Sequence, residues 1–264
     1  MKPQILQDWE ANAVATAFSK AAIRYDTAAR LQREVGTILF DKLTNCSSAS
    51  LNGLDVGAGT GFCTELLTTH CAHVVALDIA PAMLVQARHR LTGNASYLVA
   101  DTQSLPIKDH SVDVVFANLA LQWCVDLSVV FQEFKRVLKK NGQIVFSTLG
   151  PLTLWELRSA WKKVDDYRHV NDFIDIKDIQ LLLKQAGLSG FVEAKMMQLK
   201  YNSAIQLMQE LKTLGAVNVS QSRQRGLTGK RRLQQVCDEY TKLMGHQETH
   251  ATWHVLFAQL RLAN

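Results

Sequence analysis

The stretch at residues 54–62, which reads LDVGAGTGF, limits the possible folds of this chain more than any other. Residues 51–56 have the apolar character of a short buried strand, and residues 62–70 carry apolar side chains at helical spacing. The three glycines between them predict a tight turn, because glycine adopts positive φ angles and lets another molecule approach the backbone. A helix that starts directly after such a turn offers free backbone N–H groups to a ligand. The sequence therefore predicts a binding site at a strand–turn–helix unit.

Strand-like and helix-like segments alternate up to residue 150. Apolar runs predict further strands at residues 73–77, 96–100, 113–118 and 143–148, and helical spacing predicts helices at 82–91 and 127–140, with Asn141-Gly142 ending the second. This alternation predicts an α/β fold with a mainly parallel sheet and right-handed crossovers. Ligands of such sheets bind beyond the carboxyl ends of strands, and Asp78, Asp101 and Asn118 stand at three of these ends.

The two flanks of this region have a different pattern. Residues 18–43 support two amphipathic helices, so we interpret residues 1–45 as an N-terminal helical cap. Later segments predict helices at residues 152–167, 176–186, 204–214 and 230–244, and strands at 188–199 and 252–262. The segment before the last strand is too long for a simple crossover, so we expect part of it to be an insertion that covers the site. We expect one domain over residues 1–264, with a ligand-binding half at 46–150 and the insertion and C-terminal strands at 151–264.

The composition suits one large α/β domain, since 47% of the 264 residues are hydrophobic. Five scattered cysteines without a CxxC pair argue against a disulfide framework or a zinc site, so we expect no metal. The net charge of +5 allows an acidic partner without requiring nucleic acid. The N-terminus lacks the apolar run of a signal peptide, and no uncharged apolar stretch has the roughly 18 residues of a membrane span. We expect a cytoplasmic monomer that does not bind a membrane.

The glycine spacing distinguishes between cofactors. Dinucleotide-binding turns have the pattern G-x-G-x-x-G, whereas this turn reads G-x-G-x-G, with Phe62 where the third glycine would stand. Asp55 precedes the first glycine, and Asp78 follows it by about twenty positions, where a carboxylate accepts hydrogen bonds from ribose hydroxyls. This set resembles the class I S-adenosylmethionine-dependent methyltransferases, and a nicotinamide or flavin turn is the alternative. The resemblance implies a Rossmann-like fold with a seven-stranded, mostly parallel sheet, a helical insertion after strand five, and S-adenosylmethionine as cofactor.

Other segments support the same resemblance. They are LPIKDHSVDV at residues 105–114, NLALQW at 118–123 and KKNGQ at 139–143. The resemblance implies that the cofactor is bound by Tyr25, Asp55, Gly57, Ala58, Gly59, Gly61, Asp78, Ile79, Met83, Asp101, Thr102, Asn118 and Leu119. Taken alone, Asp78 is equally a cap for the helix that starts near Pro81, and Asp101 is equally a turn residue. Their joint position at strand ends favours the binding role.

The flanks resemble a narrower family. FSKAAIRYDTAARLQ at residues 18–32, LWELR at 154–158 and GLTGKRRL at 226–233 look like the malonyl-acyl-carrier-protein O-methyltransferases of biotin synthesis. One departure is Trp253, because that family often has tyrosine there. The resemblance implies methyl transfer from S-adenosylmethionine to the free carboxylate of malonyl-acyl-carrier protein or malonyl-CoA. The resulting ester would prime pimeloyl synthesis.

A carboxylate acceptor needs little chemical activation by the protein. Its reference pKa is about 4, so it is ionised at neutral pH and needs no general base. The protein has to position it and exclude water. The substrate-positioning candidates are Tyr25, Trp123, Arg158 and His169, with Arg158 first because a guanidinium group matches a carboxylate. Each also has a structural alternative. These alternatives are helix packing for Tyr25, core packing for Trp123, a solvated helix position for Arg158 and a structural role for His169.

A basic run at residues 223–232 indicates a partner. It reads RQRGLTGKRR and contains Arg223, Arg225, Lys230, Arg231 and Arg232. We expect it to dock an acidic carrier protein, because complementary charge speeds association, and a solvated loop is the alternative. Rival functions are methylation of another small acid or a quinone precursor, an RNA methyltransferase, and a non-catalytic S-adenosylmethionine-binding module. The sequence contains no aromatic-basic stacking platform, so we expect no nucleic-acid binding.

Overall fold

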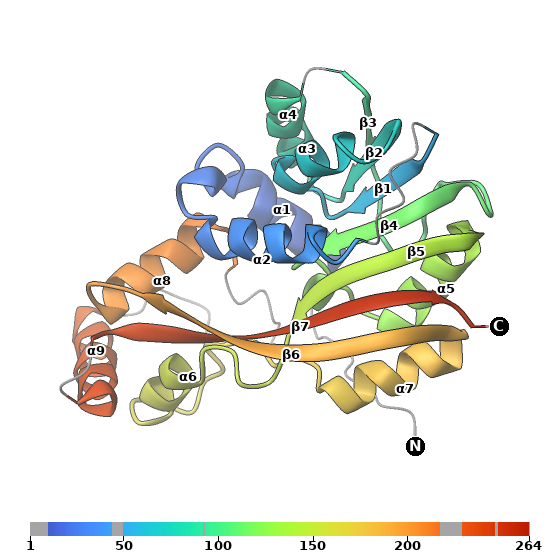
Figure 1. Cartoon of the computed structure of the whole chain (residues 1–264). Helices are drawn as coiled ribbons and strands as arrows, with labels where there is room; N and C mark the ends of the chain where they lie inside the picture. The colour runs from blue at the N-terminus through green and yellow to red at the C-terminus, as the bar shows by residue number, and fades with distance from the viewer. Residues whose placement is uncertain (1–9, 44–49, 92, 217–228, 246–247, 264) are drawn as a thin grey trace.

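The computed structural model describes residues 10–43, 50–91, 93–216, 229–245 and 248–263, whose strands form one seven-stranded sheet (Figure 1). The strands are β1 (Asn52–Val56), β2 (His73–Asp78), β3 (Ala95–Val99), β4 (Val112–Asn118), β5 (Leu138–Leu149), β6 (Leu188–Lys200) and β7 (His250–Leu262). Their order across the sheet is β3-β2-β1-β4-β5-β7-β6. The first five strands in this order are parallel, whereas β7 runs antiparallel to both β5 and β6. This confirms the predicted Rossmann-like, mostly parallel sheet.

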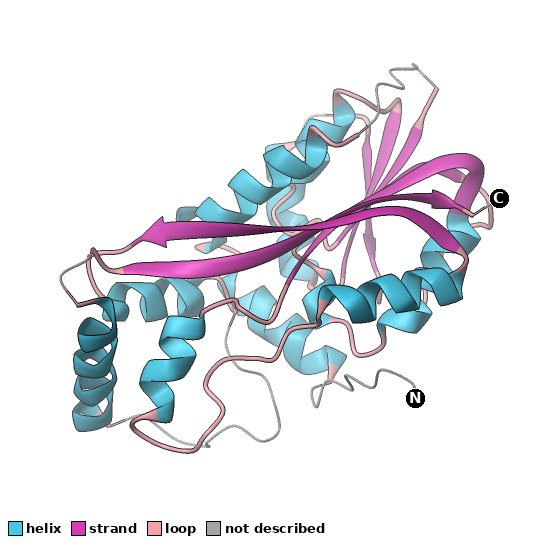
Figure 2. Ribbon diagram, turned by 60° about the horizontal axis from the view of Figure 1, so that its bottom comes forward, coloured by secondary structure: helices cyan, strands magenta, loops and turns pink. Residues whose placement is uncertain are grey.

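Helices cover both faces of the sheet (Figure 2). They are α1 (Ala11–Ala21), η1 (Tyr25–Thr27), α2 (Arg30–Phe40), α3 (Phe62–Thr68), α4 (Pro81–Arg90), η2 (Leu121–Trp123), α5 (Leu127–Val137), α6 (Trp155–Lys162), α7 (Ile176–Ala186), α8 (Ala204–Thr213) and α9 (Lys230–Met244). One core combines apolar side chains of α2, α3, α6 and α9 with those of β7, and a second core contains those of α5 and α7. The N-terminal cap consists of α1, the short η1 turn and α2.

The helix predicted at residues 127–140 is shorter than expected. It ends at Val137, because Leu138 is fully buried and pairs with Val112 as the first residue of β5. The pairing between β4 and β5 is irregular until residue 143. The Asn141-Gly142 pair therefore lies within β5 and does not end the helix, which corrects the sequence prediction.

The helix predicted at residues 152–167 is likewise limited to α6. Leu154, directly before it, has a φ angle of 54°, which breaks helical geometry. The fully buried Glu156 accepts hydrogen bonds from the backbone N–H and the hydroxyl of Thr252, which ties α6 to β7. The prediction of α7 is confirmed, and Gly187 ends that helix with a φ angle of 74°.

The strands β6 and β7 form a long ribbon that extends beyond the parallel strands (Figures 1 and 2). The helices α8 and α9 stand between these two strands in the sequence, at the position of the predicted insertion. The end of α8 lies against the N-terminal cap, where Leu214 packs on Ala28 and Ala29. Within the described ranges, none of the helices has the length and apolar character needed to cross a membrane.

Candidate functional site

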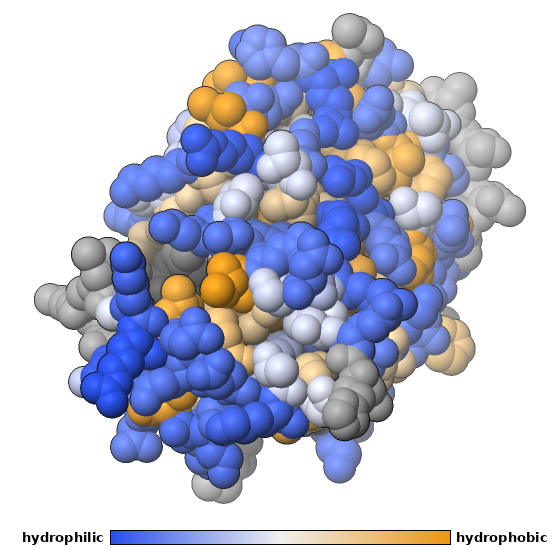
Figure 3. All heavy atoms as spheres, turned by 90° about the vertical axis from the view of Figure 1, so that its left-hand side faces the viewer, coloured by the Kyte–Doolittle hydropathy of each residue, from blue (hydrophilic) through white to orange (hydrophobic). Residues whose placement is uncertain are grey.

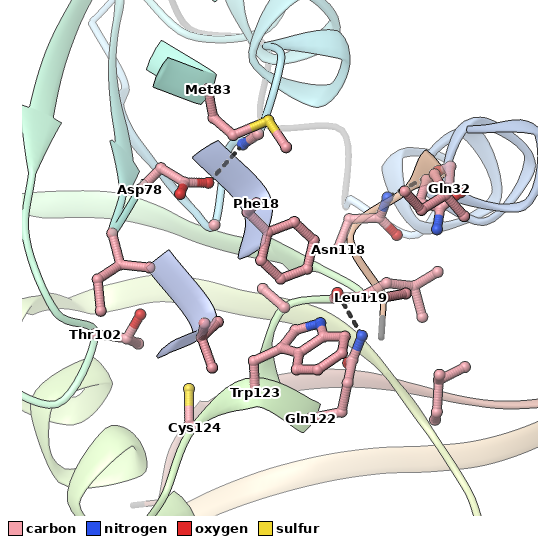
Figure 4. A pocket seen from close by; sticks show the side chains of 18 of the residues that line it. Phe18, Gln32, Asp78, Met83, Thr102, Asn118, Leu119, Gln122, Trp123 and Cys124 are labelled. Carbon is pink, nitrogen blue, oxygen red and sulfur yellow. Dashed lines mark hydrogen bonds between the residues drawn. The ribbon is translucent and has the colours of Figure 1, made fainter. Parts of the chain in front are cut away.

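A cavity opens at the carboxyl ends of β1, β2 and β4 (Figure 4). It encloses about 1080 Å³ of space, part of which is open to solvent. The N-terminal cap contributes Val14, Phe18 and Tyr25 to its walls, and α8 contributes Leu211. The sheet edge, the cap and the α8 segment therefore form the site together.

Two of the three glycines in the turn face this cavity. Gly57 and Gly59 line it with φ angles of 69° and 56°, and a Cβ atom at Gly59 would meet nothing within 4 Å. Gly61 also has a positive φ angle, of 85°, but it lies outside the cavity at the start of α3. A Cβ atom on Gly61 would lie 2.9 Å from the Cβ atom of Ala87 on α4. Gly61 therefore allows α3 and α4 to pack closely, which differs from the cofactor contact that the sequence predicted.

Asp78, the last residue of β2, holds the glycine turn. One carboxylate oxygen accepts a hydrogen bond from the Gly59 N–H at 2.9 Å, and the other accepts one from the Ala80 N–H at 2.8 Å. Burial raises the pKa of Asp78, and these backbone hydrogen bonds counteract part of that effect. Asp78 lines the cavity together with Ile79 and Met83, whereas the N-cap residue of α4 is Ala80. Asp78 is therefore not the cap of α4.

Asp55 lies in a small side chamber next to the glycine turn. Its side chain is almost fully buried and accepts a hydrogen bond from the Thr64 hydroxyl at 2.6 Å. Burial raises the pKa of Asp55 to about 7. Ala58 and Arg33 line the same chamber. A cationic group that entered this chamber would pair with the Asp55 carboxylate and lower its pKa again.

The η1 turn connects the cap to the glycine turn. Asp26 accepts a hydrogen bond from the Thr60 hydroxyl at 2.7 Å and pairs with Arg90 on α4. Its neighbour Tyr25 lines both the cavity and the side chamber. Burial and the nearby Asp78 carboxylate raise the pKa of Tyr25, so its hydroxyl stays protonated.

One end of the cavity lies beyond β3 and is lined by Asp101 and Thr102. Asp101 accepts a hydrogen bond from the Gln103 N–H at 2.8 Å, so it shapes the turn and lines the cavity at once. Cys124 lines the same end, and burial raises the pKa of its thiol to about 12. This end combines the Asp101 carboxylate with neutral side chains, so it can accept a hydrogen bond from a ligand.

The other end of the cavity is mostly apolar and has no charged side chain among its described lining residues. The Asn118 amide donates to the Gln32 carbonyl oxygen at 2.8 Å and accepts from the Ser147 hydroxyl at 2.8 Å. Trp123 forms one wall, and its ring meets the ring of Phe18 edge-on with centroids 5.2 Å apart (Figure 4). We call this end, between Trp123 and α8, the acceptor part, and the end with Asp78 and Asp101 the cofactor part.

Most residues that line the acceptor part were not predicted from the sequence. The lining residues that it did not name as site residues are Ala11, Val14, Phe18, Leu31, Gln32, Gln103, Ala120, Gln122, Cys124, Val125, Leu149, Leu211, Leu214, Ala216 and Trp253. Most are apolar, and their spacing predicted helices without indicating which face meets a ligand. Two features of the sequence could have indicated this part of the site. They are the polar Gln32 at the end of the segment at 18–32 and Trp253, where the family often has tyrosine.

Two predicted substrate-positioning residues lie away from the cavity. The Arg158 guanidinium group donates to the carbonyl oxygens of Pro151 at 3.0 Å and Asn171 at 3.1 Å. The His169 ring stacks on the Trp161 ring, with centroids 3.5 Å apart. Neither residue lines the cavity, and both hold together the segment that follows β5.

The basic run falls partly on α9. Lys230 and Arg231 are exposed at its first turn, whereas a guanidinium nitrogen of Arg232 lies 4.0 Å from the Asp165 carboxylate. Arg223 and Arg225 lie outside the described residues. The face of the molecule that includes α8 and α9 is largely hydrophilic, with scattered apolar side chains (Figure 3).

The chain matches known methyltransferases in sequence. The family model described as "Methyltransferase domain" matches residues 54–146. The chain is 41% identical, over 94% of its length, to the biotin biosynthesis bifunctional protein BioHC of Cellvibrio japonicus, of which it spans 49%. It is 38% identical, over 92% of its length, to the malonyl-[acyl-carrier protein] O-methyltransferase of Nitrosospira multiformis, of which it covers 86%.

The fold also matches solved structures. A putative methyltransferase from Bacillus halodurans superposes with a TM-score of 0.65 at 16% identity, and the match covers 88% of this chain and 100% of that one. This likeness supports the fold alone.

Proposed function

We propose that this chain methylates the free carboxylate of a malonyl thioester on acyl carrier protein or coenzyme A, because it belongs to the family of malonyl-[acyl-carrier protein] O-methyltransferases. The ester product would then prime pimeloyl synthesis for biotin. The observation that carries the proposal is a continuous cavity in which a carboxylate-lined cofactor part leads into a part whose described walls are uncharged.

S-adenosylmethionine is the cofactor of this enzyme, and the cavity residues fit it. The open space at Gly59 admits a ligand close to the backbone, and the Asp78 carboxylate has free lone pairs for ribose hydroxyls. We assign Asp55 to the cofactor's ammonium group and Asp101 to its adenine amino group. When bound, the cofactor supplies an electrophilic methyl group on a positively charged sulfur.

The acceptor requires positioning and a dry site. Its carboxylate is ionised at neutral pH, since the reference pKa is about 4, so no residue has to remove a proton. Of the predicted positioning residues, Tyr25 and Trp123 line the cavity. We assign both to excluding water and orienting the acceptor. In the best-aligned intramolecular reactions, complete positioning of the reactants lowers the barrier by at most about 7–11 kcal/mol.

The carrier protein is the proposed macromolecular partner. Its phosphopantetheine arm has to deliver the malonyl group to the acceptor part, which is lined by Leu211 of α8 and by Leu214 directly after that helix. The exposed side chains of Lys230 and Arg231 on α9 offer positive charge to an acidic carrier.

An assay with labelled methyl donor tests the proposed function. The purified protein is incubated with malonyl-carrier protein, and with acetyl-carrier protein as the matched control without a free carboxylate. We expect label on the malonyl protein alone, in a form that base removes as an ester. Label on the acetyl control, on a small acid or on RNA would instead support a different methyltransferase.

A further inference from the structure

The acceptor part of the cavity has no charged side chain in its described lining. Among the described residues around the whole cavity, only Asp78 and Asp101 carry charge, and both belong to the cofactor part. The proposed acceptor is nevertheless an anion. The described walls therefore offer it neutral N–H donors in place of lysine or arginine.

Neutral donors in the lining are the Tyr25 hydroxyl, the indole N–H groups of Trp123 and Trp253, and side-chain amides. Most of the amides are occupied. The Gln122 amide donates to the Leu119 carbonyl oxygen, and the Asn118 amide is held by its contacts with Gln32 and Ser147. The Gln32 side chain differs, because its amide oxygen is buried without a hydrogen-bond partner among the described residues. No hydrogen bond of the Gln32 side-chain amide is formed within the described part of the chain, so its N–H groups are free to donate to a ligand in the cavity that Gln32 lines.

Gln32 also lies at the junction between the two parts of the site. It lines the main cavity and the side chamber that contains Asp55 and Gly57. The hydrogen bond from Asn118 to its backbone oxygen fixes this point of α2 at the end of β4. Figure 4 shows Gln32 and Asn118 at the same side of the cavity. An in-line transfer requires the acceptor oxygen next to the methyl group of the cofactor. A cofactor held by Asp55 in the side chamber and by Asp78 in the main cavity would present its methyl group near this junction.

We propose that the side-chain amide of Gln32 donates a hydrogen bond to the acceptor carboxylate and selects thioesters that end in a free carboxylate. This inference rests on the proposed function. During the transfer, one carboxylate oxygen forms a bond to the methyl carbon, and the sulfur keeps the electron pair of the bond that breaks. No proton moves.

A neutral donor suits this reaction better than a cation. The carboxylate loses its negative charge as the ester forms, so an arginine would stabilise the starting carboxylate more than the transition state. An amide N–H holds the carboxylate more weakly and loses less as the charge disappears. Because the amide and the ester product are both uncharged, no attraction between opposite charges holds the product in the site.

The substitution Gln32→Leu removes the donor and keeps the size of the side chain. We compare the wild type, Q32L and Q185L, a matched control at an exposed position of α7. Two quantities are measured, namely kcat/KM for malonyl-CoA and the binding of malonyl-CoA and acetyl-CoA in the presence of S-adenosylhomocysteine. We expect Q32L to lower kcat/KM roughly 10- to 100-fold, as the loss of a hydrogen bond to a charged group predicts. The preference for malonyl-CoA over acetyl-CoA should fall with it.

The substitution Gln32→Glu adds a pH test that a purely structural role would not produce. A glutamate there repels the acceptor when ionised and donates a hydrogen bond when protonated. We expect the activity of Q32E, relative to the wild type, to rise as the pH falls from about 8 to about 5.5, towards the glutamate pKa. A constant ratio across this range would contradict the role of Gln32.

The outcomes separate this inference from the proposed function. Weaker binding of S-adenosylhomocysteine by Q32L, with an unchanged preference for malonyl-CoA, would assign Gln32 to the cofactor and overturn the inference. Normal methyl transfer by Q32L would also overturn it and leave the proposed function standing. Failure of the wild type to methylate malonyl thioesters would overturn both.

Discussion

The hydroxyl of Thr60 donates a hydrogen bond to the Asp26 carboxylate at 2.7 Å and joins the glycine turn to the N-terminal cap. Thr60 is 3% exposed, and Asp26 also pairs with Arg90 on α4. Tyr25, next to Asp26, lines both the cavity and the side chamber. This contact therefore positions the cap over the cofactor part of the site.

The first prediction concerns this contact. Thr60→Val keeps the shape of the side chain and removes the donor, so we expect the KM for S-adenosylmethionine to rise about tenfold. The free energy of unfolding should fall by only about 1 kcal/mol, because Asp26 remains partly solvated. Cofactor titration and denaturant unfolding measure the two effects, with Thr69→Val on the exposed end of α3 as the control. Unchanged cofactor affinity in Thr60→Val would contradict the role of the cap.

The second prediction separates two glycines of the turn. Gly59→Ala places a methyl group in the open cavity, so cofactor binding should weaken at least tenfold while stability changes by about 1 kcal/mol. Gly61→Ala places it against Ala87 and should destabilise the fold by about 2 kcal/mol or more. Thermal unfolding and titration with S-adenosylhomocysteine check both variants. Equal effects of the two substitutions on binding and on stability would argue against separate roles.

The third prediction concerns the buried carboxylate of Asp55. Burial raises its pKa from 3.8 to about 7, so between these values the folded protein binds a proton that the unfolded chain lacks. The resulting contribution to stability is present below about pH 4 and is lost as the pH rises to about 7. We expect Asp55→Asn to raise the Tm of the cofactor-free protein, more at about pH 8 than at about pH 5.

The same substitution should weaken cofactor binding, because the ammonium group loses its carboxylate partner. Thermal unfolding at two pH values, with and without S-adenosylmethionine, measures both effects. A Tm difference between Asp55→Asn and the wild type that does not depend on pH would be inconsistent with the raised pKa.

The fourth prediction concerns Arg158. Its guanidinium group holds the carbonyl oxygens of Pro151 and Asn171, so Arg158→Met should lower the free energy of unfolding by about 2 kcal/mol. The kcat/KM of the folded variant for malonyl-CoA should remain close to that of the wild type. Denaturant unfolding and steady-state kinetics check this. A specific loss of malonyl-CoA affinity at unchanged stability would restore the carboxylate-binding role predicted from the sequence.

The fifth prediction concerns carrier docking. Because Arg232 contacts Asp165, the charge reversal is made at the two exposed positions, as Lys230→Glu together with Arg231→Glu. We expect the KM for malonyl-carrier protein to rise several-fold, and more at low salt, whereas the KM for malonyl-CoA stays unchanged. Kinetics with both substrates at two salt concentrations provide the measurement. An equal rise for both substrates would exclude docking through this surface.

The sequence predicted the cavity residues at the strand ends better than the apolar walls of the acceptor part, for a physical reason. Parallel strands end at one edge of a sheet, so the positions of Asp78, Asp101 and Asn118 after three apolar runs were enough to bring them together. All three line the cavity. The alternation of elements predicted the sheet in the same way.

Other features depend on contacts that no local pattern contains. The sequence does not indicate whether the missing side chain of a glycine makes room for a ligand or, as at Gly61, for another helix. Arg158 points to two carbonyl oxygens because of how the chain folds back after β5. Leu211 and Trp253 reach the cavity only because α8 and β7 pack beside it.

Methylation of the free carboxylate of a malonyl thioester is tested most directly by mass spectrometry of malonyl-carrier protein after incubation with the enzyme and S-adenosylmethionine. We predict a gain of one methyl group on the malonyl arm, which mild base removes, and no gain on acetyl-carrier protein. An unmodified malonyl arm, under conditions in which the enzyme binds S-adenosylmethionine, would contradict the account.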